Sequence, residues 1–288
     1  MWSFTESRAK TPEGRLQNAM QDIATLLKRL GETEALSRFN AGLTSGPNPS
    51  DATLLGWLAH TIGPQATLRV IASYARQPCF CCHNGLEPCD SCDGRGHSGG
   101  SEVCVQCLGL GAARCDFCAG SGLVTYDAVP HGLQVPVALR RMKDAVSRVR
   151  QHLDQPLPRV SDVEPISSLR QAAKALSDLN RALGVFENGL LFSKDSTNCG
   201  RKTQTELAHV VRSSVQCTVA CRSRMRELIE VMAGAARLAA ESVSQDARHR
   251  AILLEQARFY DSCLGRSDPF AGTGLEHPYL DKAVAAPA

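Results

Sequence analysis

Four Cys-x-x-Cys pairs between residues 79 and 122 constrain this chain of 288 residues more than any other feature. The pairs are Cys79/Cys82, Cys89/Cys92, Cys104/Cys107 and Cys115/Cys118. Each of the last three continues as x-Gly-x-Gly, and these glycines are Gly94, Gly96, Gly109, Gly111, Gly120 and Gly122. Two residues between cysteines let both sulfurs of a tight turn face one ion, while the glycines allow positive φ angles. Eight thiolates in four pairs therefore predict two tetrahedral sites of four cysteines each, typical of structural zinc, with a disulfide framework as the alternative.

The predicted metal sites are closed. Four cysteines fill the coordination of a tetrahedral zinc ion and leave no position for water or substrate, so a structural role is expected. Amide groups of the turns can point at the thiolates and stabilise their charge. The stretch has few apolar residues of its own. Metal binding, worth about 10–16 kcal/mol for a structural zinc site, is therefore expected to drive its folding, and a chelator to unfold it.

The pattern resembles the cysteine-rich zinc-binding region of DnaJ-type co-chaperones, and the resemblance covers residues 79–122 only. In that family the first and fourth pairs share one zinc ion, and the second and third share the other. The resemblance implies an outer site made by Cys79, Cys82, Cys115 and Cys118. It implies an inner site made by Cys89, Cys92, Cys104 and Cys107. Pairing in sequence order stays open, because spacing alone does not fix connectivity.

Other parts of the sequence depart from that family. In the first repeat Asn84 and Leu86 stand where glycines are expected, and Cys81 and His83 are alternative ligands close by. The His-Pro-Asp tripeptide of a J-domain is absent, since the His-Pro dipeptide at 277–278 is followed by tyrosine. Stimulation of a heat-shock chaperone's ATPase through a J-domain is therefore not expected.

Charge argues against nucleic-acid binding by the cysteine stretch itself. The formal charge of +3 for the whole chain becomes about −1 when eight thiolates and two zinc ions are counted. Between residues 79 and 122, five acidic side chains outnumber two arginines before the metal sites are counted. Phosphate backbones are bound by positive charge, so this stretch is expected to be a poor contact for them.

The rest of the composition narrows the class of protein. No apolar run approaches the length of a membrane span, and the first residues lack the apolar core of a signal peptide. Eight of the thirteen cysteines follow metal spacing, which suits a reducing compartment and predicts a cytoplasmic protein. No Ser/His/Asp spacing, phosphate loop or paired carboxylate motif stands out, so no enzymatic activity is expected.

The flanking sequence predicts a mainly α fold, in which a helical body carries an inserted small β-hairpin-type module with two zinc ions. Apolar residues at three- and four-residue spacing predict helices at 11–39 with a break at Gly31, near 54–58, and at 65–76, 137–153, 166–183, 203–244 and 245–264. Loops are expected at 41–50 and 184–201. The last two helices are predicted to form an antiparallel hairpin with a coiled-coil-like stripe of small residues. The domains are an N-terminal helical region, the module, a C-terminal helical region and an irregular exposed tail, at 1–77, 78–126, 127–266 and 267–288.

A shared outer site has an architectural consequence. It would hold the two ends of the module together, so that the module protrudes from the body and helices 65–76 and 137–153 emerge side by side. Cys217 and Cys221, one helical turn apart, are expected in the core. Cys199 and Cys263 have no role that the sequence shows.

Three functions from different classes fit these features. The first is non-enzymatic, chaperone-like binding of an extended or unfolded polypeptide by strand edges and by Leu108, Leu110 and Phe117. The second is transcriptional regulation, because the Q-type antitermination proteins of lambdoid phages are similar in outline. Helix 137–153 would then contact DNA or RNA polymerase through Arg140, Arg141, Lys143, Arg148 and Arg150, whereas a solvated basic face is the structural alternative. The third is thiol–disulfide exchange by the Cys-x-x-Cys pairs.

Overall fold

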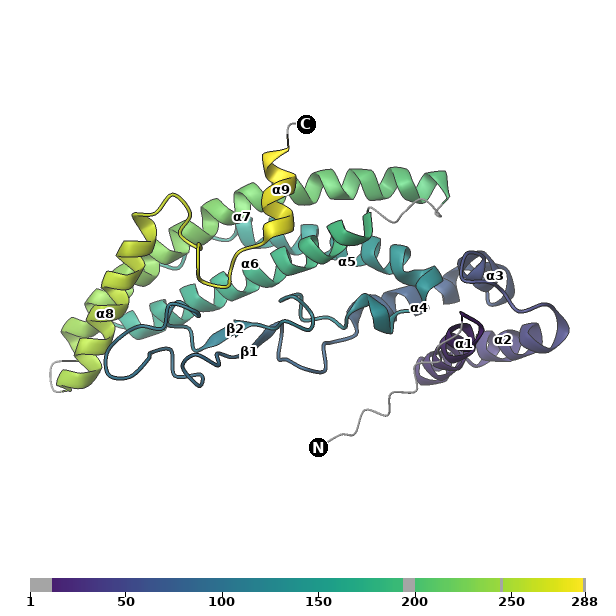
Figure 1. Ribbon diagram of the computed structural model, residues 1–288, viewed down its shortest axis with the longest axis horizontal. Coiled ribbons are helices and arrows are strands. Elements are labelled where there is room, and N and C mark those ends of the chain that lie inside the picture. Colours follow the sequence, from purple (N-terminus) through teal and green to yellow (C-terminus); the bar gives the residue numbers. More distant parts are fainter. Residues whose placement is uncertain (1–11, 194–199, 244–245, 287–288) are drawn as a thin grey trace.

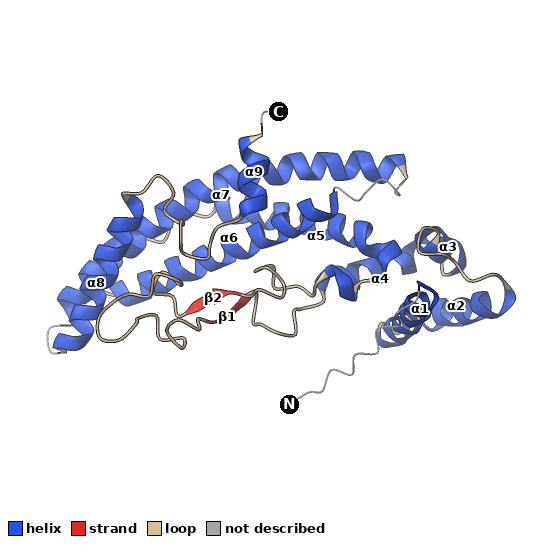
Figure 2. Ribbon diagram, in the orientation of Figure 1, coloured by secondary structure: helices blue, strands red, loops and turns tan. Residues whose placement is uncertain are grey.

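The computed structural model describes residues 12–193, 200–243 and 246–286 and shows a mainly helical protein with one small antiparallel sheet (Figures 1 and 2). The long helices α5 (His131–Asp154), α6 (Pro165–Ser193) and α7 (Arg201–Ser242) run side by side and form the body. The cysteine module lies along this body, between the N-terminal helices at one end and α8 (Ala247–Leu264) at the other. The predicted fold class, helices with a small inserted sheet, is confirmed at this level.

The N-terminal region packs four helices around a core of its own. These are α1 (Pro12–Arg29), α2 (Thr33–Ser45), α3 (Leu54–Thr61) and α4 (Pro64–Arg76). Gly31, with a φ of 72°, separates the first two helices as the sequence predicted. The loop expected from residue 41 begins only after Ser45, so that prediction was early by about one turn. The core side chains are Ile23, Leu27, Phe39, Leu54, Leu58 and Val70, together with the start of α5.

Two predicted helix boundaries in the body are wrong. Helix α6 continues to Ser193 through the expected loop, because its glycines serve packing and not a turn. A Cβ at Gly184 would lie 2.6 Å from the carbonyl oxygen of Ala119, and one at Gly189 would lie 2.3 Å from the sulfur of Met142. Helix α5 begins at His131, six residues before the start predicted at 137, and includes Pro136.

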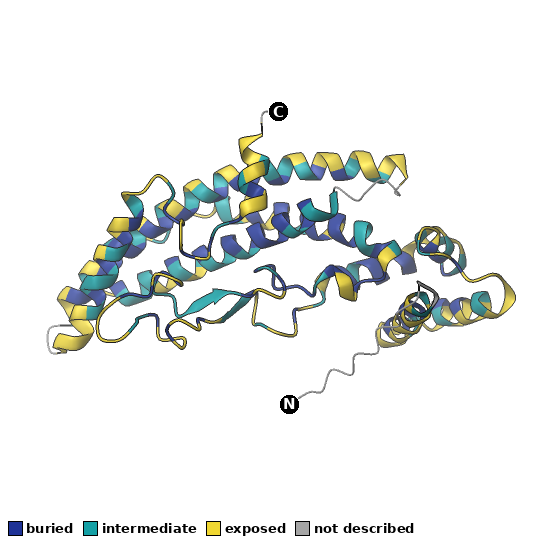
Figure 3. Ribbon diagram, in the orientation of Figure 1, coloured by how far each residue is buried: buried dark blue, intermediate teal, exposed yellow. Residues whose placement is uncertain are grey.

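The long hairpin of α7 and α8 forms as predicted. Its buried stripe is made of small and flexible side chains, including Cys221, Met225, Met232, Ala235 and Ala239 (Figure 3). Cys217 is buried as well, which confirms its assignment to the core. Cys263, for which the sequence showed no role, is also buried. Cys199 lies outside the described residues. Even the longest of the described helices lacks an apolar stretch sufficient to cross a membrane.

The expectation of an exposed tail is wrong, although residues 267–277 are irregular as predicted. Phe270, Leu275 and Leu280 are buried in the same core as α6 and α7, and the chain ends its described part in helix α9 (Pro278–Ala285). These apolar residues are spaced five apart, which matches neither helical nor strand periodicity and so gave no signal. The tail therefore belongs to the body.

Candidate metal centre

The cysteines of the module converge into two groups of four. One group is Cys79, Cys82, Cys115 and Cys118, and the other is Cys89, Cys92, Cys104 and Cys107; within each group all sulfurs lie within 4.8 Å of one another. The residues are buried apart from Cys82, which is half-buried. Pair one therefore meets pair four and pair two meets pair three, which is the nested arrangement that the resemblance implied. Cys81 and His83 lie outside both groups.

The distances between sulfurs fit a tetrahedral cation. Sγ atoms lie 3.6 Å apart for Cys82 and Cys118 and 3.8 Å apart for both Cys89–Cys104 and Cys92–Cys107. A tetrahedron with zinc–sulfur bonds of about 2.3 Å has edges of about 3.8 Å. A disulfide joins its sulfurs at about 2.05 Å, and the cysteines of the described chain are free. A four-thiolate donor set of this size suits zinc.

A short hairpin connects the two groups. Strand β1 (Leu86–Pro88) pairs antiparallel with β2 (Ala112–Arg114), with Glu87 opposite Ala113. At the open end the amide of Cys79 donates to the Gly122 carbonyl at 3.0 Å, and Pro78 and Leu123 form a bridge. The two ends of the module are thus adjacent, as expected, and α4 and α5 leave it as neighbours.

Backbone conformation aims the amides of the turns at sulfur. The residue after the second cysteine is left-handed in three repeats, with φ values of 49° at Asp93, 53° at Leu108 and 49° at Ala119. In the first repeat Asn84, two residues after Cys82, takes this conformation at 54°, as its side chain allows. The amides of Gly96 and Gly122 then donate to the sulfurs of Cys92 and Cys118 at 3.2 and 3.3 Å.

The glycines also explain why the repeats nest. A Cβ at Gly85 would lie 2.3 Å from the Gly120 carbonyl oxygen, so the first turn packs directly on the fourth. A Cβ at Gly111 would lie 2.3 Å from the Gly94 carbonyl oxygen, so the third turn packs on the second. Backbone approaches this close leave no room for any side chain.

The affinity of these sites for metal depends on the protonation of their thiols. Burial raises the pKa of the Cys82 thiol to about 12. A cation that binds thiolate must therefore displace a proton from this sulfur, and binding will be weaker at acid pH.

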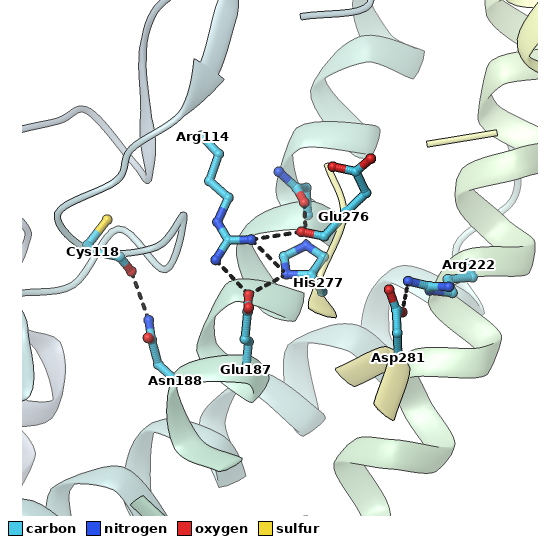
Figure 4. A network of polar contacts seen from close by, with 9 residues as sticks. Arg114, Cys118, Glu187, Asn188, Arg222, Glu276, His277 and Asp281 are labelled. Carbon is cyan, nitrogen blue, oxygen red and sulfur yellow. Dashed lines mark hydrogen bonds and ion pairs between the residues drawn. The ribbon is translucent and has the colours of Figure 1, made fainter. Parts of the chain in front are cut away.

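A network of polar contacts joins the module to the body (Figure 4). The Arg114 guanidinium at the end of β2 donates to Glu187 Oε2 on α6 at 2.6 Å and to the Glu276 carbonyl at 2.9 Å. Ring nitrogens of His277 lie 2.8 Å from Glu187 Oε2 and 2.7 Å from Asn180 Oδ1. Sequence reasoning missed Glu187 and His277, because nothing local signals partners that lie 90 residues apart.

The expectation of a protruding module is therefore wrong. The Asn188 amide also donates to the Cys118 carbonyl at 2.8 Å (Figure 4). Leu108 is buried in one core with Tyr260 of α8. One side of the module is docked on α6 and α8, and only its other side faces solvent.

Docking decides which predicted polypeptide contacts are accessible. Leu108 is fully buried, so its prediction is wrong, and Leu110 packs partly buried against the core. Phe117 is 40% exposed and lies against Phe80, which is 56% exposed, with ring centroids 4.6 Å apart. Phe80 directly follows Cys79 of the outer group, yet nothing in the sequence pattern marked it as a contact residue.

The prediction that Arg141 lies on an exposed basic face of α5 is wrong. Arg141 is only 3% exposed and donates to the carbonyl oxygens of Tyr74, Ala75 and Val124. Burial lowers its pKa, and its guanidinium lies 4.7 Å from the centre of the Tyr126 ring. Arg141 thus ties α4 and the end of the module to α5, and nucleic acid cannot reach it.

Neighbouring basic residues are partly engaged. Arg140 pairs with Asp144 at 3.3 Å and Lys143 with Glu206 at 3.0 Å. Arg148 and Arg150 are both exposed, and partial burial of the Arg148 guanidinium lowers its pKa. The helix therefore presents scattered charges in place of a continuous basic stripe.

Comparisons with known protein families, with curated protein sequences and with solved structures find no match for this chain. The likeness of its cysteine stretch to the DnaJ-type region stands on the spacing of its own residues. The geometry establishes two four-sulfur groups compatible with metal, held beside a small sheet in a mainly helical protein.

Proposed function

We propose that this chain is a zinc-binding, non-enzymatic protein that binds polypeptides through its cysteine module. The pair of four-sulfur groups carries the proposal. Each offers a full tetrahedral set of ligands, so a zinc ion held there has no open position for water or substrate and serves as a structural centre. The metal would then fix the shape of a surface.

The accessible side of the module offers an aromatic surface. Phe80 follows Cys79 and Phe117 precedes Cys118, so both rings are attached directly to the outer group. Both are substantially exposed while in contact with each other. Aromatic rings on a rigid frame lose little entropy on binding and are frequent anchors of interfaces. This surface supports polypeptide binding, and the resemblance to the DnaJ-type region points to unfolded or extended clients.

The two alternatives receive less support. Regulation of transcription through α5 would need Arg141, which is buried. Thiol–disulfide exchange would need accessible sulfurs, whereas those of both groups are gathered around a common centre where metal competes for them.

The test begins with metal analysis of the purified full chain, where two zinc ions per chain are expected. The zinc-loaded protein should suppress aggregation of an unfolded client, and the double variant Phe80→Ser with Phe117→Ser should lose this activity while it keeps its zinc. Val163→Ser, at a residue that is 90% exposed in a loop before α6, is the control. Absence of bound metal, or a loaded protein that neither protects a client nor retains a peptide, would refute the proposal.

A further inference from the structure

The aromatic surface continues into a small cavity. The cavity has a volume of about 160 Å³, and its walls include Phe117, Val124, Tyr126, Asn188 and Phe192. The ring centroids of Tyr126 and Phe192 lie 4.0 Å apart, so this wall is formed by aromatic rings packed against each other. A cavity of about 150 Å³ lined by apolar side chains holds a benzene ring. The volume therefore suits one large aliphatic or aromatic side chain of a partner.

A positive charge lies at the cavity and restricts what can enter. Arg141 lines it, with its guanidinium fixed by three carbonyl oxygens and by the face of Tyr126. A lysine or arginine of a partner would meet a like charge in a place shielded from water, where repulsion is strong. The side chain that enters the cavity must therefore be uncharged.

The rim carries the opposite charge. Asp127 lines the cavity and is exposed, and Asp116 is exposed next to Phe117. Neither carboxylate forms an ion pair within the described part of the chain. A zinc ion with four thiolates has a net charge of about −2, which adds to the negative field of this side.

The basic residues of the module do not offset this field. Arg114 is directed inward to Glu187, with 16% of its side chain exposed, and Arg95 pairs with Asp93. Arg181, a further cation close to the outer group, keeps its charge, but it donates to the Ser121 carbonyl from α6, on the docked side of the module. Glu87, on the hairpin between the groups, adds another carboxylate.

From this arrangement we propose that the partner is a basic polypeptide segment, in which an apolar side chain that enters the cavity is flanked by lysine or arginine. The inference rests on the proposed function, since it specifies the ligand of the same surface. The flanking cations meet Asp116 and Asp127 and lie over the exposed rings of Phe80 and Phe117, where cation–π contact is available. Charge complementarity of this kind raises the association rate and selects among partners.

The experiment uses three labelled peptides of equal length with one central leucine, flanked by lysine, serine or glutamate. Binding to the zinc-loaded full chain is measured by fluorescence anisotropy at low salt and again at several-fold higher salt. The lysine peptide should bind at least about tenfold more tightly than the glutamate peptide, and the difference should shrink as salt screens the charges.

A charge-neutral variant localises the effect. Asp116→Asn with Asp127→Asn should remove most of the lysine preference, whereas Asp154→Asn with Asp162→Asn, two exposed carboxylates outside the module, should leave it unchanged. If no peptide binds, the proposed function itself fails. If all three bind equally, or the glutamate peptide binds best, only the basic-partner inference is overturned.

Discussion

The cysteine module and the α5–α8 bundle lie side by side, yet they bury different kinds of atoms. The bundle buries aliphatic and aromatic side chains along helix faces, such as Leu176, Phe186 and Met232. Inside the module the buried clusters are the cysteines themselves, with Ala113 and little else. Burial of one leucine contributes about 1.5–3 kcal/mol, whereas a structural zinc site contributes about 10–16 kcal/mol. The bundle is thus stabilised by many small contributions from buried side chains, whereas the module is stabilised by two large contributions from its metal sites.

The largest effect that separates the two regions is loss of a metal ligand. Cys104→Ser should empty the inner group of its metal and unfold the module, because about 10–16 kcal/mol of binding is withdrawn from a region with almost no apolar core. Hydrogen exchange should show loss of protection between residues 79 and 122, while α5 and α7 of the bundle keep theirs. Cys81→Ser is the matched control, since Cys81 is exposed and outside both groups. Equal loss of protection in both regions would mean that the module and bundle fold as one unit.

The next largest effect concerns the contact between the two regions. Arg114→Met leaves the Glu187 carboxylate, whose side chain is 5% exposed, without its cation and should destabilise the protein by about 3–5 kcal/mol. Arg95→Met is the control within the same module, because its pair with Asp93 is exposed on both sides and contributes about 0–1 kcal/mol. Chemical denaturation at saturating zinc measures both. Similar values for the two variants would show that the docking pair contributes little.

A smaller effect tests whether close backbone packing, and not only left-handed geometry, fixes the turns. Gly111→Ala should cost about 3 kcal/mol, because it combines a positive φ with a Cβ 2.3 Å from the Gly94 carbonyl oxygen. Gly100→Ala has a similar φ, 76° against 72°, but meets nothing within 4 Å. It should cost only the conformational term, about 1–2 kcal/mol. If the two substitutions are equally destabilising, contact between turns does not matter.

The comparison also explains what the sequence could predict. The metal ligands are predictable from local sequence, since the two cysteines of each pair share a turn. Most helices are predictable from the periodicity of their apolar residues. Docking of the module was not predictable, because it depends on single residues far apart in the chain. The sequence indicated a loop at Gly184, which is a packing position against Ala119. It indicated a surface contact at Leu108, which is buried in the same core as Tyr260. The sequence placed Arg141 on a basic face. A buried arginine that donates hydrogen bonds to carbonyl groups cannot be distinguished from a solvated arginine by sequence alone.

The smallest effect is a pH dependence that arises where the tail meets the module. Burial lowers the pKa of His277 below its ordinary value near 6.5; the neighbouring Glu187 opposes this shift, while Arg114 and Arg222 reinforce it. As pH falls through about 6.5, the unfolded chain takes up a proton before the native protein does, so the free energy of unfolding decreases. Each unit of depression is worth about 1.4 kcal/mol.

Urea unfolding of the zinc-saturated protein between about pH 7.5 and about pH 5.5 should show this decrease, and His277→Gln should flatten it. Loss of metal at acid pH affects both proteins alike, so the difference between them isolates the histidine. The opposite slope, with the wild-type protein gaining stability over the variant on acidification, would mean that His277 is charged in the native state. The ion pair with Glu187 would then outweigh burial, and the link between module, α6 and tail would be electrostatic in the same sense as that of Arg114.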